Sequence, residues 1–305
     1  MENIIEAKNL SKSFGAFKAV DNISFNVKRG ELFGFLGVNG AGKSTTINML
    51  STLLKNSSGE IKICGLNLGK NDAEIRKRIG IVFQSNSLDD LLTVKENLIS
   101  RAYLYEDDKK RIKKNLDNVC EILKIGEHLN KQFKYLSGGQ KRSCDIARAL
   151  INTPEILFLD EPTTGLDPKT RKNLWDCIEY LRTENNMTIF LTTHYMEEAA
   201  KAQNISIIDR GRIVASGTPF KLKEEYACDQ LKIEPENIEE VKKILDVHNL
   251  SYSEDTNRIK VAIPHTLYAI QILKELEKHI RSFEVVQGTM DDVFLNITGK
   301  TLSEN

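Results

Sequence analysis

Apolar residues over the first 230 positions fall into short runs, and segments of helical spacing lie between them. Alternating apolar and polar positions predict half-buried strands, while continuous apolar runs predict buried ones. The expected strands lie at 4–7, 23–27, 32–36, 60–64, 79–83, 155–160, 188–192, 205–209 and 213–215. The expected helices lie at 43–54 and begin at 169 and 196. This succession predicts an α/β domain with a largely parallel sheet.

Two parts of the chain depart from this alternation. Helical spacing runs from Thr93 to Tyr135 and again from Ser137 to Leu150, which predicts a helical subdomain at about 90–150. A boundary near Cys228 divides the chain into a domain at 1–228 and a smaller one at 229–305.

The smaller domain has a recognisable order of elements. Strands are expected at 230–234, 250–253, 258–263 and 281–286, and helices at 236–247, 266–279 and 290–297. The order strand, helix, strand, strand, helix, strand is that of a ferredoxin-like α+β fold, and an amphipathic helix follows it.

Composition narrows the class of protein. Lys and Arg equal Asp and Glu at 43 each over 305 residues, so the formal net charge is zero and no nucleic acid is expected as a partner. The five cysteines have neither disulfide nor zinc spacing, which indicates a reducing compartment. No apolar run approaches the roughly 20 residues of a membrane span, and no signal peptide is evident. We therefore expect a cytoplasmic protein that serves a membrane only through another chain.

A glycine-rich loop between an expected strand and an expected helix is the first candidate site. Its glycines let successive backbone N–H groups point towards phosphates at the positive end of a helix. Lys43 is expected to reach the β- and γ-phosphates, and the Ser44 hydroxyl to bind Mg²⁺. The residues expected to bind nucleotide here are Gly37, Asn39, Gly40, Ala41, Gly42, Lys43, Ser44 and Thr45.

Two adjacent acids end the apolar strand at 156–160. Strand ends at this edge of an α/β sheet are where ligands bind. Asp160 is placed to join the Mg²⁺ shell, and Glu161 to orient or deprotonate the attacking water. Two acids with separate tasks predict hydrolysis of the bound nucleotide.

A second glycine turn opens the helix that ends near Leu150. Ser137 is a natural N-cap, and Gly138 and Gly139 leave backbone N–H groups uncovered at the positive end of the helix dipole. Together with Gln140, these residues predict a second anion site aimed at the γ-phosphate.

Three further residues fit the same chemistry. Gln84 follows a buried strand and carries an amide able to bond metal-bound water. His194 follows another strand end, where it could contact the γ-phosphate. Phe14 is an aromatic available to stack on adenine. Taken singly, these residues also fit a surface amide, a capping histidine and a core aromatic.

With these motifs in order, the chain resembles the ATP-binding subunit of an ABC transporter over roughly its first three quarters. The resemblance implies ATP and Mg²⁺ as cofactors. It implies that catalysis depends on Lys43, Gln84, Glu161 and His194. It also implies that the metal is bound by Ser44, Gln84 and Asp160. It also implies a homo- or heterodimer with a second ABC ATPase subunit, in which Ser137, Gly138, Gly139 and Gln140 act in trans. Separate transmembrane permease subunits would place the dimer on the inner face of the membrane.

Residues 193–199 and 290–299 are similar to the daunorubicin-resistance type of export ATPase, which implies a hydrophobic substrate such as a drug or lipid. Two alternatives remain at this point. One is an importer ATPase whose C-terminal domain senses substrate. The other is a soluble ABC ATPase of translation or DNA repair.

Overall fold

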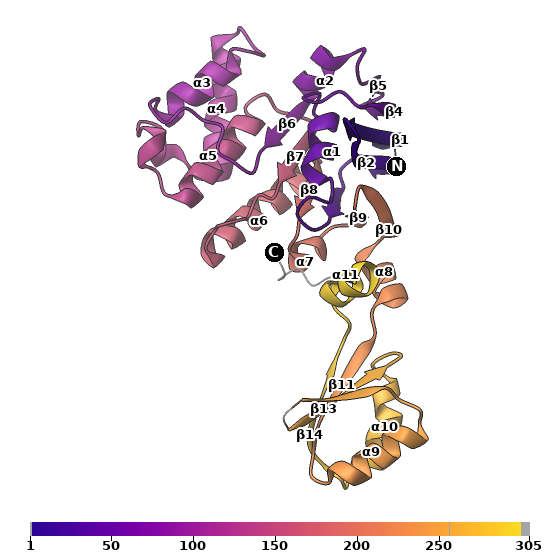
Figure 1. Cartoon of the computed structure of the whole chain (residues 1–305). Coiled ribbons are helices and arrows are strands. Elements are labelled where there is room, and N and C mark those ends of the chain that lie inside the picture. The colour runs from indigo at the N-terminus through magenta and orange to yellow at the C-terminus, as the bar shows by residue number, and fades with distance from the viewer. Residues whose placement is uncertain (1, 256, 300–305) are drawn as a thin grey trace. The chain divides into compact units, whose positions relative to one another are not determined.

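The computed structural model describes residues 2–255 and 257–299. The chain forms two compact units, the first ending at Ser216 and the second beginning at Gly217. Helix α8 (Pro219–Tyr226) falls in the second unit, so the observed division precedes the predicted one at 228 by one helix. Figure 1 shows the elements of both units.

The first unit contains two sheets. The larger sheet has the order β10-β9-β3-β8-β7-β6, and the pairs β9–β3, β3–β8, β8–β7 and β7–β6 are parallel. Its strands are β3 (Leu32–Leu36), β6 (Ile79–Val82), β7 (Ile156–Asp160), β8 (Thr188–Thr193), β9 (Asn204–Asp209) and β10 (Arg212–Gly217). The smaller, antiparallel sheet has the order β2-β1-β4-β5. Its strands are β1 (Asn3–Phe14), β2 (Phe17–Lys28), β4 (Ser58–Ile63) and β5 (Leu66–Asn67).

The helices of this unit confirm the α/β class and show where the sequence pattern is weak. They are α1 (Lys43–Leu50), α2 (Asp72–Arg78), α3 (Val94–Ala102), α4 (Lys109–Leu123), α5 (Gly138–Leu150), α6 (Pro168–Glu184) and α7 (Met196–Ala199). Figure 1 shows α3, α4 and α5 gathered to one side of the sheets. The stretch 93–135 is interrupted because Lys124 ends α4 in the left-handed conformation, and two short 3₁₀ turns follow.

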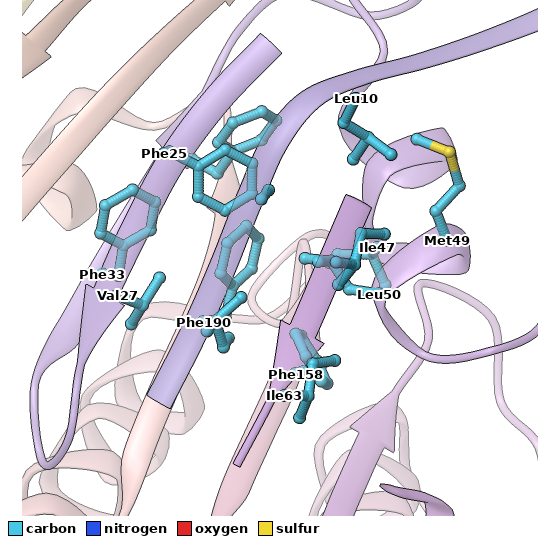
Figure 2. Packing of buried hydrophobic residues seen from close by; sticks show 14 of the residues in the cluster. Leu10, Phe25, Val27, Phe33, Ile47, Met49, Leu50, Ile63, Phe158 and Phe190 are labelled. Carbon is cyan, nitrogen blue, oxygen red and sulfur yellow. The ribbon is translucent and has the colours of Figure 1, made fainter. Parts of the chain in front are cut away.

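A cluster of aromatic rings forms the core of the first unit. Phe25 of the antiparallel sheet lies 5.8 Å from Phe33 and 6.0 Å from Phe190 of the parallel sheet, measured between ring centroids. Ile47 and Leu50 of α1 are buried in the same cluster, as Figure 2 shows. Each such side chain stabilises the fold by about 1.5–3 kcal/mol through burial. The helix that follows the glycine loop is therefore held firmly in the core.

The second unit has the predicted ferredoxin-like order. Its antiparallel sheet has the order β12-β13-β11-β14. After α8, the elements are β11 (Asp229–Pro235), α9 (Ile238–Val247), β12 (Tyr252–Asp255), β13 (Arg258–Ile263), α10 (Tyr268–Leu276), β14 (Ile280–Val286) and α11 (Met290–Thr298). Its own buried cluster includes Leu231 and Ile233 of β11 and Ile272 of α10. This unit thus has a hydrophobic core of its own.

Candidate active site

The glycine loop joins β3 to α1 and requires glycine for steric reasons. Gly42 has φ of 112°, and a Cβ atom there would lie 2.6 Å from the carbonyl oxygen of Ala19. A Cβ atom on Gly37 would lie 2.5 Å from the carbonyl oxygen of Ile208. Backbone atoms cannot move away as a flexible side chain can, so these two positions accept only glycine.

Lys43 begins α1, and its ammonium group is almost fully buried. The Nζ atom donates to the carbonyl oxygens of Gly37 at 2.8 Å and Val38 at 3.2 Å, and it lies 3.1 Å from Oε1 of Glu161. An ammonium has three N–H donors, so these three acceptors use all of them. Ser44, next along the helix, is exposed, and Thr45 is half-buried.

Asp160 and Glu161 are held at the end of β7 by Thr192 of the neighbouring strand β8. The Thr192 hydroxyl donates to Oδ1 of Asp160 at 2.5 Å. The backbone N–H of Glu161 donates to the carbonyl and hydroxyl oxygens of Thr192, at 3.1 and 3.2 Å. Glu161 has φ of 45°, a left-handed conformation that costs a non-glycine residue about 1–3 kcal/mol. The surrounding bonds must hold this carboxylate in place.

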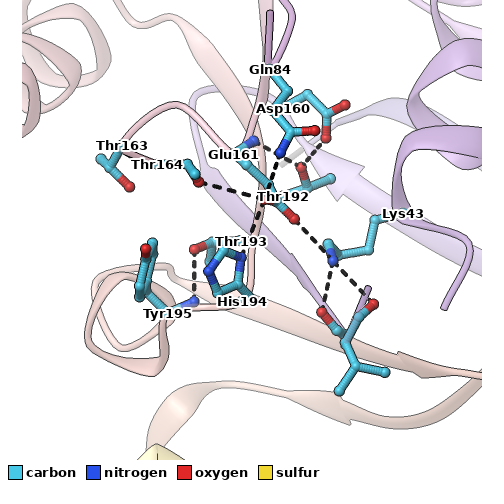
Figure 3. Close-up of polar contacts among 12 residues, drawn as sticks. Lys43, Gln84, Asp160, Glu161, Thr163, Thr164, Thr192, Thr193, His194 and Tyr195 are labelled. Atoms are coloured by element: carbon cyan, nitrogen blue, oxygen red, sulfur yellow. Dashed lines mark hydrogen bonds and ion pairs between the residues drawn. The ribbon is translucent and has the colours of Figure 1, made fainter. Parts of the chain in front are cut away.

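The second oxygen of Glu161 faces the other predicted polar residues, as Figure 3 shows. Oε2 lies 3.2 Å from Nδ1 of His194, and it accepts from Nε2 of Gln84 and from Oγ1 of Thr164, each at 3.5 Å. The structure therefore brings Lys43, Gln84, Asp160, Glu161 and His194 together at one edge of the parallel sheet. A buried carboxylate with an ammonium on one side and an imidazole on the other is suited to activating a water molecule.

The Ser137 turn forms the N-terminus of α5, as the sequence predicts. The Ser137 hydroxyl accepts from the backbone N–H of Gln140 at 3.4 Å, and Gln140 Oε1 accepts from the backbone N–H of Ser137 at 3.0 Å. A Cβ atom on Gly138 would meet open space, whereas one on Gly139 would lie 2.5 Å from Thr170. Within the described residues, no hydrogen bond or ion pair joins this turn to Lys43 or Glu161.

Phe14 lies at the end of β1. Its ring is 51% exposed, and the Nζ atom of Lys12 lies 5.1 Å from the ring centroid. The Lys12 ammonium lies over one face of the ring, so a planar group would stack on the other face. Phe14 is not the core aromatic that the residue type alone would also allow.

One face of α5 carries three buried charged residues that the sequence analysis misses. Arg142 donates through Nε to the carbonyl oxygen of Pro162 at 2.7 Å, and through its other nitrogens to those of Phe83 and Asp160. Asp145 accepts from the backbone N–H of Ser87 at 3.0 Å, and Arg148 donates to the carbonyl oxygen of Ile81.

The spacing of these three residues, at i, i+3 and i+6, is the signal that could have revealed a shared face. Burial lowers the pKa of both Arg142 and Arg148 and raises that of Asp145. The helix behind the Ser137 turn is thus anchored to the backbone on either side of Gln84 and next to Glu161.

Comparisons with known proteins relate both units to ATP-binding proteins. A family model described as "ABC transporter" matches residues 20–164, and one described as "ATP-binding protein DrrA1-3-like, C-terminal domain" matches residues 217–298. The daunorubicin/doxorubicin resistance ATP-binding protein DrrA of Streptomyces peucetius is 34% identical, over 97% of this chain and 92% of that protein. The linearmycin resistance ATP-binding protein LnrL of Bacillus subtilis is 35% identical, over 99% of this chain and 100% of that protein.

A solved structure of similar fold is the dimeric post-hydrolysis state of the ATP-binding cassette MJ0796 bound to ADP and Pi. Its TM-score is 0.65 at 29% identity, and the match covers 70% of this chain and 98% of that one. Over the described ranges 2–255 and 257–299, the structure contains no helix with the length and apolar character of a membrane span.

Proposed function

Because this chain belongs to the ABC transporter family of ATP-binding proteins, we propose that its ATPase activity powers a separate membrane permease that exports its substrate. The observation that carries the proposal is the burial of Glu161 between Lys43 and His194, at 3.1 and 3.2 Å. The drug-resistance names of the relatives support export of a hydrophobic compound. The permease would hold this chain on the inner face of the membrane.

In this proposal the loop from Gly37 to Ser44 binds the ATP phosphates, and Phe14 offers its exposed ring to the adenine. Lys43 exchanges one of its present acceptors for a phosphate oxygen, since all three of its donors are already used. Glu161 accepts the proton of the attacking water, and His194 contacts the γ-phosphate.

The oxygen donors present fit Mg²⁺, which prefers a few protein oxygens together with water and phosphate. Ser44 offers an exposed hydroxyl, and Asp160 a carboxylate at the end of β7. The amide oxygen of Gln84 is a further donor, because its nitrogen is the atom that faces Glu161. When bound there, Mg²⁺ would neutralise negative charge on the phosphates.

We also propose that the site is completed by a second ATP-binding subunit. The Ser137 turn presents uncovered backbone N–H groups but makes no hydrogen bond to Lys43 or Glu161 among the described residues of its own chain. A partner's turn would instead close over the γ-phosphate, so that Ser137, Gly138 and Gly139 act in trans. The dimeric state of the MJ0796 cassette supports this arrangement.

The test is the substitution Glu161→Gln. The variant should bind ATP with wild-type affinity, lose at least 100-fold in kcat, and accumulate as a dimer with ATP, because the amide cannot accept the proton of water. The measurements are phosphate release, nucleotide binding and size-exclusion chromatography. Glu197→Gln is the control, because Glu197 is exposed. Wild-type turnover in Glu161→Gln would contradict the assignment.

A further inference from the structure

The short helix α7 follows the loop that carries His194, and its two adjacent glutamates have different environments. Glu197 is exposed, whereas Glu198 is only 3% exposed and has no role in the nucleotide site described above. Burying a carboxylate costs free energy unless hydrogen bonds replace its water. The buried carboxylate of Glu198 therefore requires hydrogen-bond donors from the protein.

Both carboxylate oxygens of Glu198 accept hydrogen bonds from buried threonines. Oε1 accepts from the hydroxyl of Thr163, and Oε2 from the hydroxyl of Thr193 at 2.8 Å. The Thr193 hydroxyl also accepts from the backbone N–H of Tyr195 at 2.9 Å. The Thr193 hydroxyl thus accepts one bond and donates its single proton to Glu198.

The two threonines flank the proposed catalytic groups. Thr163 lies two residues after Glu161, and Thr193 directly precedes His194; both threonines are drawn in Figure 3. The left-handed backbone at Glu161 is held on one side by its N–H bonds to Thr192. Glu198 holds the other side, because it accepts hydrogen bonds both from the turn after Glu161 and from Thr193 at the end of β8.

We propose that Glu198 is a positioning residue, which sets the distance between the Glu161 carboxylate and the His194 ring. The inference rests on the proposed function, in which these two groups serve ATP hydrolysis. Glu198 touches neither group directly and lies outside the phosphate loop. Its loss should therefore lower turnover while leaving nucleotide binding intact. A misplacement of about 1 Å at a reacting group lowers rate by about 100-fold.

Four variants test the proposal. Glu198→Ala removes both acceptors, and Thr163→Val removes one donor at nearly constant volume. Glu198→Gln keeps an acceptor for Thr193 and can donate its amide N–H to the Thr163 oxygen. Glu197→Ala is the matched control on the same helix.

Glu198→Ala should lower kcat by about 10- to 100-fold with KM for ATP within threefold of wild type. Glu198→Gln should recover most of that loss, and Glu197→Ala should match wild type. Adding Thr163→Val to Glu198→Ala should cause little further loss, because the bond between the two side chains is already gone. Unchanged kcat in Glu198→Ala, or an equal effect of Glu197→Ala, would overturn the proposal.

A readout that needs no turnover separates this inference from the proposed function. The ¹⁵N resonances of the His194 ring report the contact with Glu161, and His194→Asn identifies them. They should shift in Glu198→Ala and stay in place in Glu197→Ala. If Glu198→Ala does not fold, Thr163→Val and Glu198→Gln give the same readout at smaller amplitude. An unshifted ring in all the position-198 and position-163 variants contradicts the positioning role, even if ATP hydrolysis is absent.

Discussion

Among single residues, Cys144 shows most directly how burial changes acid–base behaviour. Its side chain is fully buried in α5, and burial raises its pKa from 9.0 to about 12. Between these two values the unfolded chain loses the thiol proton while the folded chain keeps it. Unfolding therefore becomes more favourable as pH rises, by about 1.4 kcal/mol per pH unit for this group.

This predicts a measurable difference between two cysteine variants. Urea unfolding from pH 9 to 11 can be followed through Trp175, the single tryptophan, which is buried in α6 of the first unit. Cys144→Ala should lose stability less steeply with pH than wild type, by about 1.4 kcal/mol per unit. Cys228→Ala, at an exposed position, should follow wild type. Equal slopes for all three proteins would contradict the burial argument.

The positions of single residues at the candidate site were predictable where the residues lie in contiguous motifs. Lys43 and Glu161 belong to such motifs, and each follows a strand whose end faces the site. Glu198 and Arg142 could not be found in this way, because each has at least one partner that is distant in sequence. Thr163 lies 35 positions from Glu198, and Phe83 lies 59 positions from Arg142. Only the fold brings these groups into contact.

At the scale of elements, α5 connects the Ser137 turn to the edge of the parallel sheet. The guanidinium of Arg142 alone satisfies three backbone carbonyl groups, next to Gln84 and Glu161. Removing one partner of a buried charged hydrogen-bond network is costly, because the remaining groups lose both water and protein partners.

Arg142→Gln should therefore lower the free energy of unfolding of the first unit by about 2–4 kcal/mol. It should also lower kcat, since the carbonyl groups it releases lie beside two proposed catalytic residues. Arg111→Gln is the matched control, because that side chain is 73% exposed in α4. Urea unfolding followed by Trp175 fluorescence, with ATPase assays, measures both effects. A loss no larger than that of Arg111→Gln would contradict the anchoring role.

Strands flanked by turn residues were predicted well, whereas two short helices that bury only one residue each were not. The predicted strands at 32–36 and 258–263 coincide with β3 and β13, because turn residues flank regular apolar patterns. Helices α2 and α8 were missed. Each buries a single residue, Ile75 and Leu222, so neither has an apolar periodicity that a sequence pattern could detect.

At the scale of the whole molecule, each unit has a core of its own. Residues 217–305 expressed alone should therefore unfold cooperatively, which circular dichroism can measure. Within that fragment, Ile272→Ala should lower the free energy of unfolding by about 2–5 kcal/mol, because Ile272 is fully buried in α10. Ile270 lies on the same helix but is 53% exposed, so Ile270→Ala should lower the free energy of unfolding much less. A fragment without a cooperative transition would show that the second unit depends on the first.

The hydrogen bonds on the buried face of α5 also limit how far the Ser137 turn can move. Arg142 lies five residues beyond Ser137, which is about 7.5 Å along a helix. A tilt of about 5° around the Arg142 anchor would then move the Ser137 turn by only about 0.7 Å. That displacement is comparable to the roughly 0.5 Å range over which N–H···O hydrogen-bond lengths vary. The surface that this chain would offer to a second subunit is thus held in place by hydrogen bonds within its own fold, without any contact from that subunit.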